Sequence, residues 1–137
     1  MLIAKQSRFF IAVAALLGAT AVMFGAYASH GLSAWANPSQ VSQVQLAAQY
    51  QLFHTITLLI VSLLNSVFLS RLLSVSLYCF SVGTLCFSGS LYYLVFFNSK
   101  SLVLVTPVGG LLLICAWLLV AVAMIFKQKN KGLCEQV

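Results

Sequence analysis

The sequence predicts an all-α integral membrane protein that folds as one four-helix bundle over residues 1–137. Three observations predict this class: 62% of the residues are apolar, only 6% are charged, and no charge occurs between Arg8 and Arg71. Soluble domains carry about 25% charged residues. A helix that crosses a bilayer needs about 20 apolar residues. Four such helices take about 80 residues and leave enough chain for connections and tails.

The first transmembrane span is expected over about residues 9–28. Lys5 and Arg8 precede it, and the Ala26-Tyr27-Ala28 site near its end is also typical of a cleaved signal peptide. The apolar run is about 18 residues, longer than the usual 7–15 of a signal peptide, so we expect the span to be retained. Small residues repeat at spacings of four and three along it, at positions 14, 18, 21, 25 and 28.

The second span is expected over about residues 46–69. The segment before it, residues 31–45, is polar and contains Trp35 and the pair Asn37-Pro38, which favours a turn or the start of a helix. Tyr50 and His54 lie four residues apart in this span. They therefore share one helix face.

The third span is expected over about residues 72–97. Its small residues repeat at spacings of three and four, at positions 76, 79, 83, 86 and 90. Small side chains let membrane helices approach closely. We expect the first and third spans each to pack through this stripe against a partner helix, and they could pair with each other. A substrate groove along such a face is the functional alternative.

The fourth span is expected over about residues 102–126, followed by a short basic tail at 127–137. Thr106 is a good N-cap, and Pro107 is favoured at the first helical position. We expect a proline-kinked helix; the alternative is a helix that starts at Pro107 and leaves residues 102–105 non-helical. The residues expected to serve helix packing are Gly18, Gly25, Gly83, Gly89, Pro107, Gly109 and Gly110.

The basic residues predict that both termini are cytoplasmic. With the N-terminus inside, Lys100 is the one basic residue outside, whereas the inside holds Lys5, Arg8, Arg71, Lys127, Lys129 and Lys131. This distribution obeys the positive-inside rule for four spans. The charges flank apolar runs, so the net charge of +6 reports membrane orientation and does not indicate nucleic-acid binding.

The scarcity of acidic residues excludes several kinds of chemistry. Glu135 is the single acidic side chain. Mechanisms that need two carboxylates are therefore excluded, as in glycosidases and two-metal sites. The four cysteines form no C-x-x-C pair, and two histidines are too few for a closed zinc site. We expect no metal site and no cofactor.

Polar side chains concentrate in the outer halves of the spans. Polar groups in a membrane are costly and usually face the bundle interior. We therefore expect a polar cluster near the non-cytoplasmic surface that positions a ligand or stabilises the bundle, made of His30, Tyr50, His54, Ser88, Ser90, Tyr92 and Thr106.

A non-enzymatic protein whose outer pocket binds a lipid-like molecule or a partner helix is the leading functional expectation. A small oligomeric transporter or channel is the alternative. Less favoured are a redox protein with two histidine ligands to a haem and an intramembrane hydrolase that pairs Ser90 with His54. The expected partners are the lipid bilayer and, as alternatives left open, a second copy of the chain or another membrane protein.

Four blocks of sequence resemble a known family. Residues 25–32 (GAYASHGL) are similar to its G-A-F-G-A-H-x-L block, and residues 49–54 (QYQLFH) to its Y-Q-x-x-H block. Residues 83–92 (GTLCFSGSLY) and 106–110 (TPVGG), with Trp117 further on, look like its third and fourth blocks. The family is domain-of-unknown-function family 423, which includes eukaryotic transmembrane protein 256 and the bacterial YgdD/YwdK-like proteins.

This resemblance covers nearly the whole chain and looks closest to the bacterial inner-membrane branch. It departs from the family pattern at Ser29 and Ala116, where the family has Ala and Gly. Both replacements stay small, so close helix approach is little affected. The resemblance implies four retained spans and an inner-membrane location, and it implies no assigned reaction.

Overall fold

A computed structural model describes the backbone of residues 5–134 and the side chains of residues 5–126. Its four helices are α1 (Lys5–His30), α2 (Pro38–Phe68), α3 (Arg71–Phe96) and α4 (Val105–Cys134), and the described residues contain no strand. Each helix is long and apolar enough to cross a membrane, with the fourth candidate span at Lys100–Phe126. The expected all-α, four-span class is confirmed. The backbone of 127–134 continues α4, while the side chains of the predicted basic tail lie outside the described residues.

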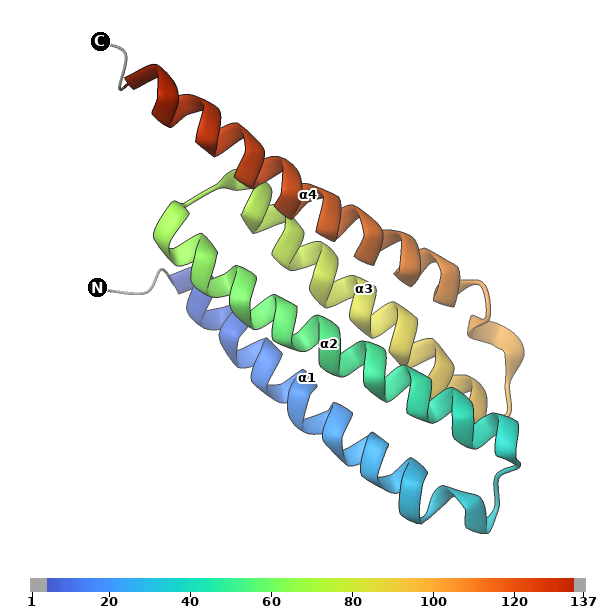
Figure 1. The fold of residues 1–137 in the computed structure, drawn as a ribbon. Coiled ribbons are helices and arrows are strands. Elements are labelled where there is room, and N and C mark those ends of the chain that lie inside the picture. The colour runs from blue at the N-terminus through green and yellow to red at the C-terminus, as the bar shows by residue number, and fades with distance from the viewer. Residues whose placement is uncertain (1–4, 135–137) are drawn as a thin grey trace.

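Consecutive helices run antiparallel, so the two chain ends and the α2–α3 connection share one end of the bundle (Figure 1). The other end carries two short 3-10 helices, η1 (Leu32–Ala34) and η2 (Lys100–Leu102). We call it the distal end. Helix α1 packs on α2, α2 on α3 and α3 on α4, whereas the α1 and α3 backbones lie further apart and meet through long side chains. The bundle is therefore open between α1 and α4.

Helix α2 begins at Pro38, well before the expected residue 46. Asn37 Oδ1 accepts a hydrogen bond of 2.9 Å from Gln40 N, and Gln40 Oε1 accepts one of 3.0 Å from Asn37 N. This capping box satisfies two backbone N–H groups that a helix start leaves without partners. The polar residues that followed Asn37-Pro38 were expected to form a connection, but the cap makes them the first turns of the helix.

Helix α4 begins at Val105, between the start of the expected span at residue 102 and the alternative helix start at Pro107. Pro107 lies in the first turn, where its missing N–H has no carbonyl to pair with, so it causes no kink in the helix interior. Leu102 ends η2, and residues 103–104 form the turn between the two helices. The non-helical segment at the start of the fourth span is therefore limited to residues 103–104, and the expected kink at Pro107 is absent.

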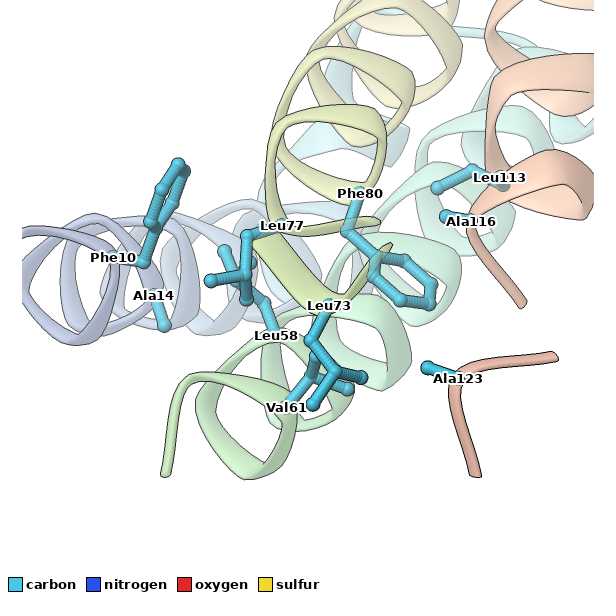
Figure 2. Packing of buried hydrophobic residues seen from close by; sticks show 10 residues of the cluster. All are labelled: Phe10, Ala14, Leu58, Val61, Leu73, Leu77, Phe80, Leu113, Ala116 and Ala123. Atoms are coloured by element: carbon cyan, nitrogen blue, oxygen red, sulfur yellow. The ribbon is translucent and has the colours of Figure 1, made fainter. Parts of the chain in front are cut away.

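Helix α3 lies at the centre of the apolar core. Because lipid is as apolar as leucine, such cores associate by close packing. In Figure 2 the α3 side chains lie between those of α1 and α2 on one side and those of α4 on the other. The buried cluster contains Phe10, Ala14, Leu58, Val61, Leu73, Leu77, Phe80, Leu113, Ala116 and Ala123.

The two stripes of small residues face different helices. A Cβ added to Gly18 of α1 would lie 3.3 Å from Thr55 Cγ2, and one added to Gly25 would lie 3.7 Å from Ala48 Cβ, both on α2. A Cβ at Gly83 of α3 would lie 3.0 Å from Leu113 Cδ2 on α4. The option that the two stripes pair with each other is therefore wrong: each stripe packs on the helix next in the chain.

The other glycines predicted to serve helix packing differ in how closely a neighbouring helix approaches them. A Cβ at Gly109 of α4 would lie 2.8 Å from Phe87 Cα, closer than real side chains approach, whereas one at Gly110 would lie 3.9 Å from Phe87 Cδ2. Gly109 thus lets α4 approach the α3 backbone. A Cβ at Gly89 would meet no atom within 4 Å among the described residues. Gly89 therefore departs from the expected packing role and borders open space.

Candidate functional site

The expected polar residues do not form one cluster. Ser88 and Tyr92 face α2, Ser90 and Thr106 join α3 to α4, Tyr50 and His54 lie among aromatic rings, and His30 lies at the distal end of α1. Helical side chains two residues apart point in nearly opposite directions, because each residue turns the helix by about 100°. Ser90 and Tyr92 thus face different neighbours although they are close in sequence.

Gln51 is the centre of the most connected polar group. Its side chain is 4% exposed. Gln51 Nε2 donates to Leu17 O and to Thr20 Oγ1, each at 2.8 Å, and its Oε1 accepts from the Tyr92 hydroxyl at 2.9 Å. One amide therefore joins α1, α2 and α3. Such a bond is favoured in a membrane, where unpaired polar groups find no water.

Gln51 and Thr20 were not among the residues predicted to form the polar cluster. Gln51 stands inside the Y-Q-x-x-H block beside Tyr50, and an amide within an apolar span was a signal that could have identified it. Ser88 adds a further link from α3 to α2, since its hydroxyl donates to Ala47 O at 2.8 Å.

Ser90 and Thr106 form the polar joint between α3 and α4. Their hydroxyl oxygens lie 2.6 Å apart, and Ser90 Oγ donates to Phe87 O at 2.9 Å. A serine hydroxyl has one hydrogen, so Thr106 is the donor to Ser90. In the described part of the chain no hydrogen bond joins Ser90 to His54. The pair that the hydrolase alternative requires is therefore not formed.

His54 lies in an aromatic environment. Its ring centroid is 5.9 Å from that of Tyr50, 6.2 Å from Phe80 and 6.5 Å from Trp117. His54 Nδ1 lies 2.7 Å from Tyr50 O. A carbonyl oxygen only accepts, so Nδ1 is the donor in this hydrogen bond. This local bond orients the ring within the aromatic group and accounts for His54 without a substrate.

His30 borders a groove between α1 and α2 at the distal end. The groove has a volume of about 510 Å³. Its residues on α1 are Ala21, Val22, Gly25, Ala26, Ser29 and His30, and those on α2 are Gln45, Ala48, Gln49 and Leu52. Because the helices are antiparallel, Ser29, His30 and Gln45 lie at one end, and Ala21, Val22 and Leu52 at the other. The groove is polar at the distal end and apolar deeper in the bundle.

The two histidines belong to different sites. His30 shares the groove with Gln45, which lies nine residues before His54 on α2, a separation of about 14 Å along the helix. Within the described residues, no group of three or more His, Cys, Asp or Glu side chains could hold a metal ion. The geometry thus offers an amphipathic groove and several interhelical hydrogen-bond joints.

Comparison with known proteins gives a consistent family assignment. The profile described as "Protein of unknown function (DUF423)" matches residues 24–110. A UPF0382 membrane protein of Haemophilus influenzae is 36% identical over 121 residues, which are 88% of this chain and 96% of the relative. No solved structure matches the chain.

Further relatives carry the same family name. The UPF0382 inner membrane protein YgdD of Escherichia coli (strain K12) is 35% identical over 134 residues, 95% of this chain and 98% of the relative. A UPF0382 membrane protein of Staphylococcus aureus is 34% identical over 116 residues, 85% of this chain and 94% of the relative. With four helices able to span a bilayer, the protein is a multi-pass inner-membrane protein, and it belongs to the DUF423 family.

Proposed function

We propose that this protein is a non-enzymatic lipid-binding protein that holds a phospholipid in the groove between α1 and α2. The change of polarity along the groove carries the proposal. His30, Gln45 and Gln49 supply hydrogen-bond donors for a headgroup, Ser29 Oγ, which donates to Gly25 O, supplies an acceptor, and Val22 and Leu52 border the deeper part. Residues 21–30 cover about 14 Å along α1, which accommodates a headgroup and the first part of an acyl chain.

Small residues create the space for this ligand. Gly25 and Ala48 meet at the floor of the groove, where a Cβ on Gly25 would lie 3.7 Å from Ala48 Cβ. Ala26 is exposed and lines the same groove. A larger side chain at Ala26 would fill the groove without entering the contact between α1 and α2.

The proposed orientation sets the headgroup end in the outer leaflet. Arg8 and Arg71 lie at the end that holds the termini, and Lys100 lies in η2 at the distal end. The larger number of basic residues at the terminal end favours a cytoplasmic location for that end. The distal groove then opens toward the non-cytoplasmic surface.

The internal use of the other polar groups supports a binding role over catalysis. Ser90, Thr106 and Tyr92 bond to neighbouring helices, and His54 bonds to its own helix. These groups stabilise the bundle. The side chains of His30, Gln45 and Gln49 make no hydrogen bond within the described residues and are available to a ligand.

Native mass spectrometry of the full chain tests the proposal. The protein is extracted in mild detergent from membranes containing phosphatidylethanolamine and phosphatidylglycerol. We expect one retained phospholipid on the unmodified chain and strongly reduced retention for Ala26→Leu. Ala19→Leu is the matched control, because Ala19 is also exposed on α1 and does not line the groove. Equal retention by both variants, with equal thermal stability, would overturn the proposal.

A further inference from the structure

A second, smaller cavity lies between α1, α2 and α3 and shares no residue with the lipid groove. Its volume is about 150 Å³. The polar residues around it are Thr20, Gln51, Thr84 and Tyr92, and the others are Leu17, Phe24, Leu85 and Gly89. Its polar side chains come from three helices, so no single helix accounts for their convergence.

The internal hydrogen bonds use most of the donors around this cavity. Both Gln51 N–H groups are occupied, by Leu17 O and Thr20 Oγ1, and the Tyr92 hydrogen goes to Gln51 Oε1. The Thr20 hydrogen goes to the carbonyls of Leu16 and Leu17. What remains are acceptor lone pairs on Gln51 Oε1 and Tyr92 Oη.

Thr84 is the unused member of the group. Its side chain is 2% exposed, and its hydroxyl makes no hydrogen bond with any residue that the structure describes. Threonine within a helix can satisfy itself on the carbonyl four residues back, as Thr57 does on Phe53 O at 2.9 Å. Thr84 instead borders the cavity. Its hydroxyl oxygen keeps some accessible surface, unlike the fully enclosed Thr55 Oγ1. A polar group without a hydrogen-bond partner in an apolar environment is unfavourable, so this group indicates that something in the cavity bonds to it.

We infer that the cavity is a binding site for a hydroxyl group. The bound hydroxyl accepts a hydrogen bond from Thr84 and donates its own hydrogen to Tyr92 Oη or Gln51 Oε1, which matches the one free donor and the free acceptors. No charged side chain lines this cavity, so the ligand is neutral. The hydroxyl belongs either to water or to an amphipathic alcohol from the bilayer. A water molecule occupies about 30 Å³ in the liquid, so either source fits the volume.

The sign of a stability change gives the first test. Thr84→Val keeps the shape and removes the hydroxyl. If the site is occupied, the variant loses its ligand contact and its melting temperature in liposomes falls by about 3 °C, whereas Thr84→Ser stays close to the unmodified protein. If the cavity is empty, Thr84→Val removes an unpaired polar group and the melting temperature rises, which would overturn the inference.

Thr55→Val is the matched control. Thr55 Oγ1 also lacks a hydrogen-bond partner among the described residues, but it is fully enclosed, and Thr55 does not line the cavity. We expect this variant to melt at the same temperature as the unmodified chain or higher. Opposite effects of the two threonine-to-valine changes support the site. A fall of equal size in both would show a general effect of losing a hydroxyl and would overturn it.

Solid-state NMR of the labelled full chain identifies the source of the hydroxyl. In liposomes of phosphatidylethanolamine and phosphatidylglycerol, magnetisation transfer from water to Thr84 identifies water. If no transfer occurs, 1-hexanol is added. Chemical-shift changes at Thr84, Gln51 and Tyr92 identify an amphipathic alcohol, provided that Thr84→Val abolishes the changes at Gln51 and Tyr92. If there is no transfer from water and no chemical-shift change on addition of 1-hexanol, the inference is overturned. The lipid groove shares none of these residues, so this result is independent of the proposed function.

Discussion

The Tyr92 hydroxyl donates a hydrogen bond of 2.9 Å to Gln51 Oε1, and this bond connects α3 to an amide that also holds α1. The backbones of α1 and α3 approach each other at few positions. Their relative position therefore depends on long side chains, including the polar group that Gln51 organises. Phe24 strengthens the same region, because its ring stacks on Tyr92 with centroids 4.2 Å apart.

Tyr92→Phe should lower the free energy of unfolding by about 0.6–2 kcal/mol, the range for interhelical hydrogen bonds in membranes. The change removes the donor to Gln51 and keeps the ring that packs on Phe24. Steric trapping or thermal unfolding in bicelles measures the loss. Tyr93→Phe is the control, since the Tyr93 hydroxyl makes no hydrogen bond within the described residues. Equal stability of the two variants would contradict the role given to Tyr92.

Gly109→Ala should destabilise the protein by about 1–3 kcal/mol, the usual cost of overpacking. A Cβ at Gly109 would lie 2.8 Å from Phe87 Cα, and a backbone atom can move away only if the two helices separate. The neighbouring change Gly110→Ala is the control, because its Cβ would lie 3.9 Å from the nearest atom. The melting temperatures of the two variants should therefore differ clearly. If Gly109→Ala and Gly110→Ala have the same melting temperature, the close approach of α4 to the α3 backbone is wrong.

The double change Gln45→Leu and Gln49→Leu should weaken phospholipid binding about tenfold. Each lost hydrogen bond is worth about 0.5–1.5 kcal/mol, and about 1.4 kcal/mol corresponds to a factor of ten. Titration of the protein with a phospholipid in detergent, followed by native mass spectrometry, measures the dissociation constant. Gln43→Leu serves as the control, because Gln43 lies on α2 outside the groove. Unchanged affinity in the double variant would count against a headgroup at this end.

A cysteine at Ser33 should react with a membrane-impermeant maleimide added to intact spheroplasts, because η1 is expected outside. The measurement uses a chain in which the native cysteines are replaced by serine. A cysteine at Leu69, which is 73% exposed at the opposite end of the bundle, should react only after the membrane is disrupted. The reverse pattern of labelling would invert the predicted orientation.

The apolar spans could be predicted because each depends on a local property of the sequence. A run of about 20 apolar residues favours the bilayer whatever its neighbours are, and the expected span at 72–97 accordingly lies close to α3, Arg71–Phe96. The start of α2 was predicted less well. There the Asn37–Gln40 capping box extends the helix through polar residues that hydropathy assigns to a connection.

The sequence by itself determined that this is an all-helical membrane protein with four spans, and which helix faces carry small or polar residues. The tertiary structure alone decided which faces meet. The small-residue stripes of α1 and α3 look alike in sequence, yet Gly18 meets Thr55 of α2 and Gly83 meets Leu113 of α4. Likewise Tyr92 turns to Gln51 while Ser90 turns to Thr106. A periodic pattern identifies a face, but its partner depends on the lateral order and rotation of the helices, which arise from packing among residues far apart in the chain.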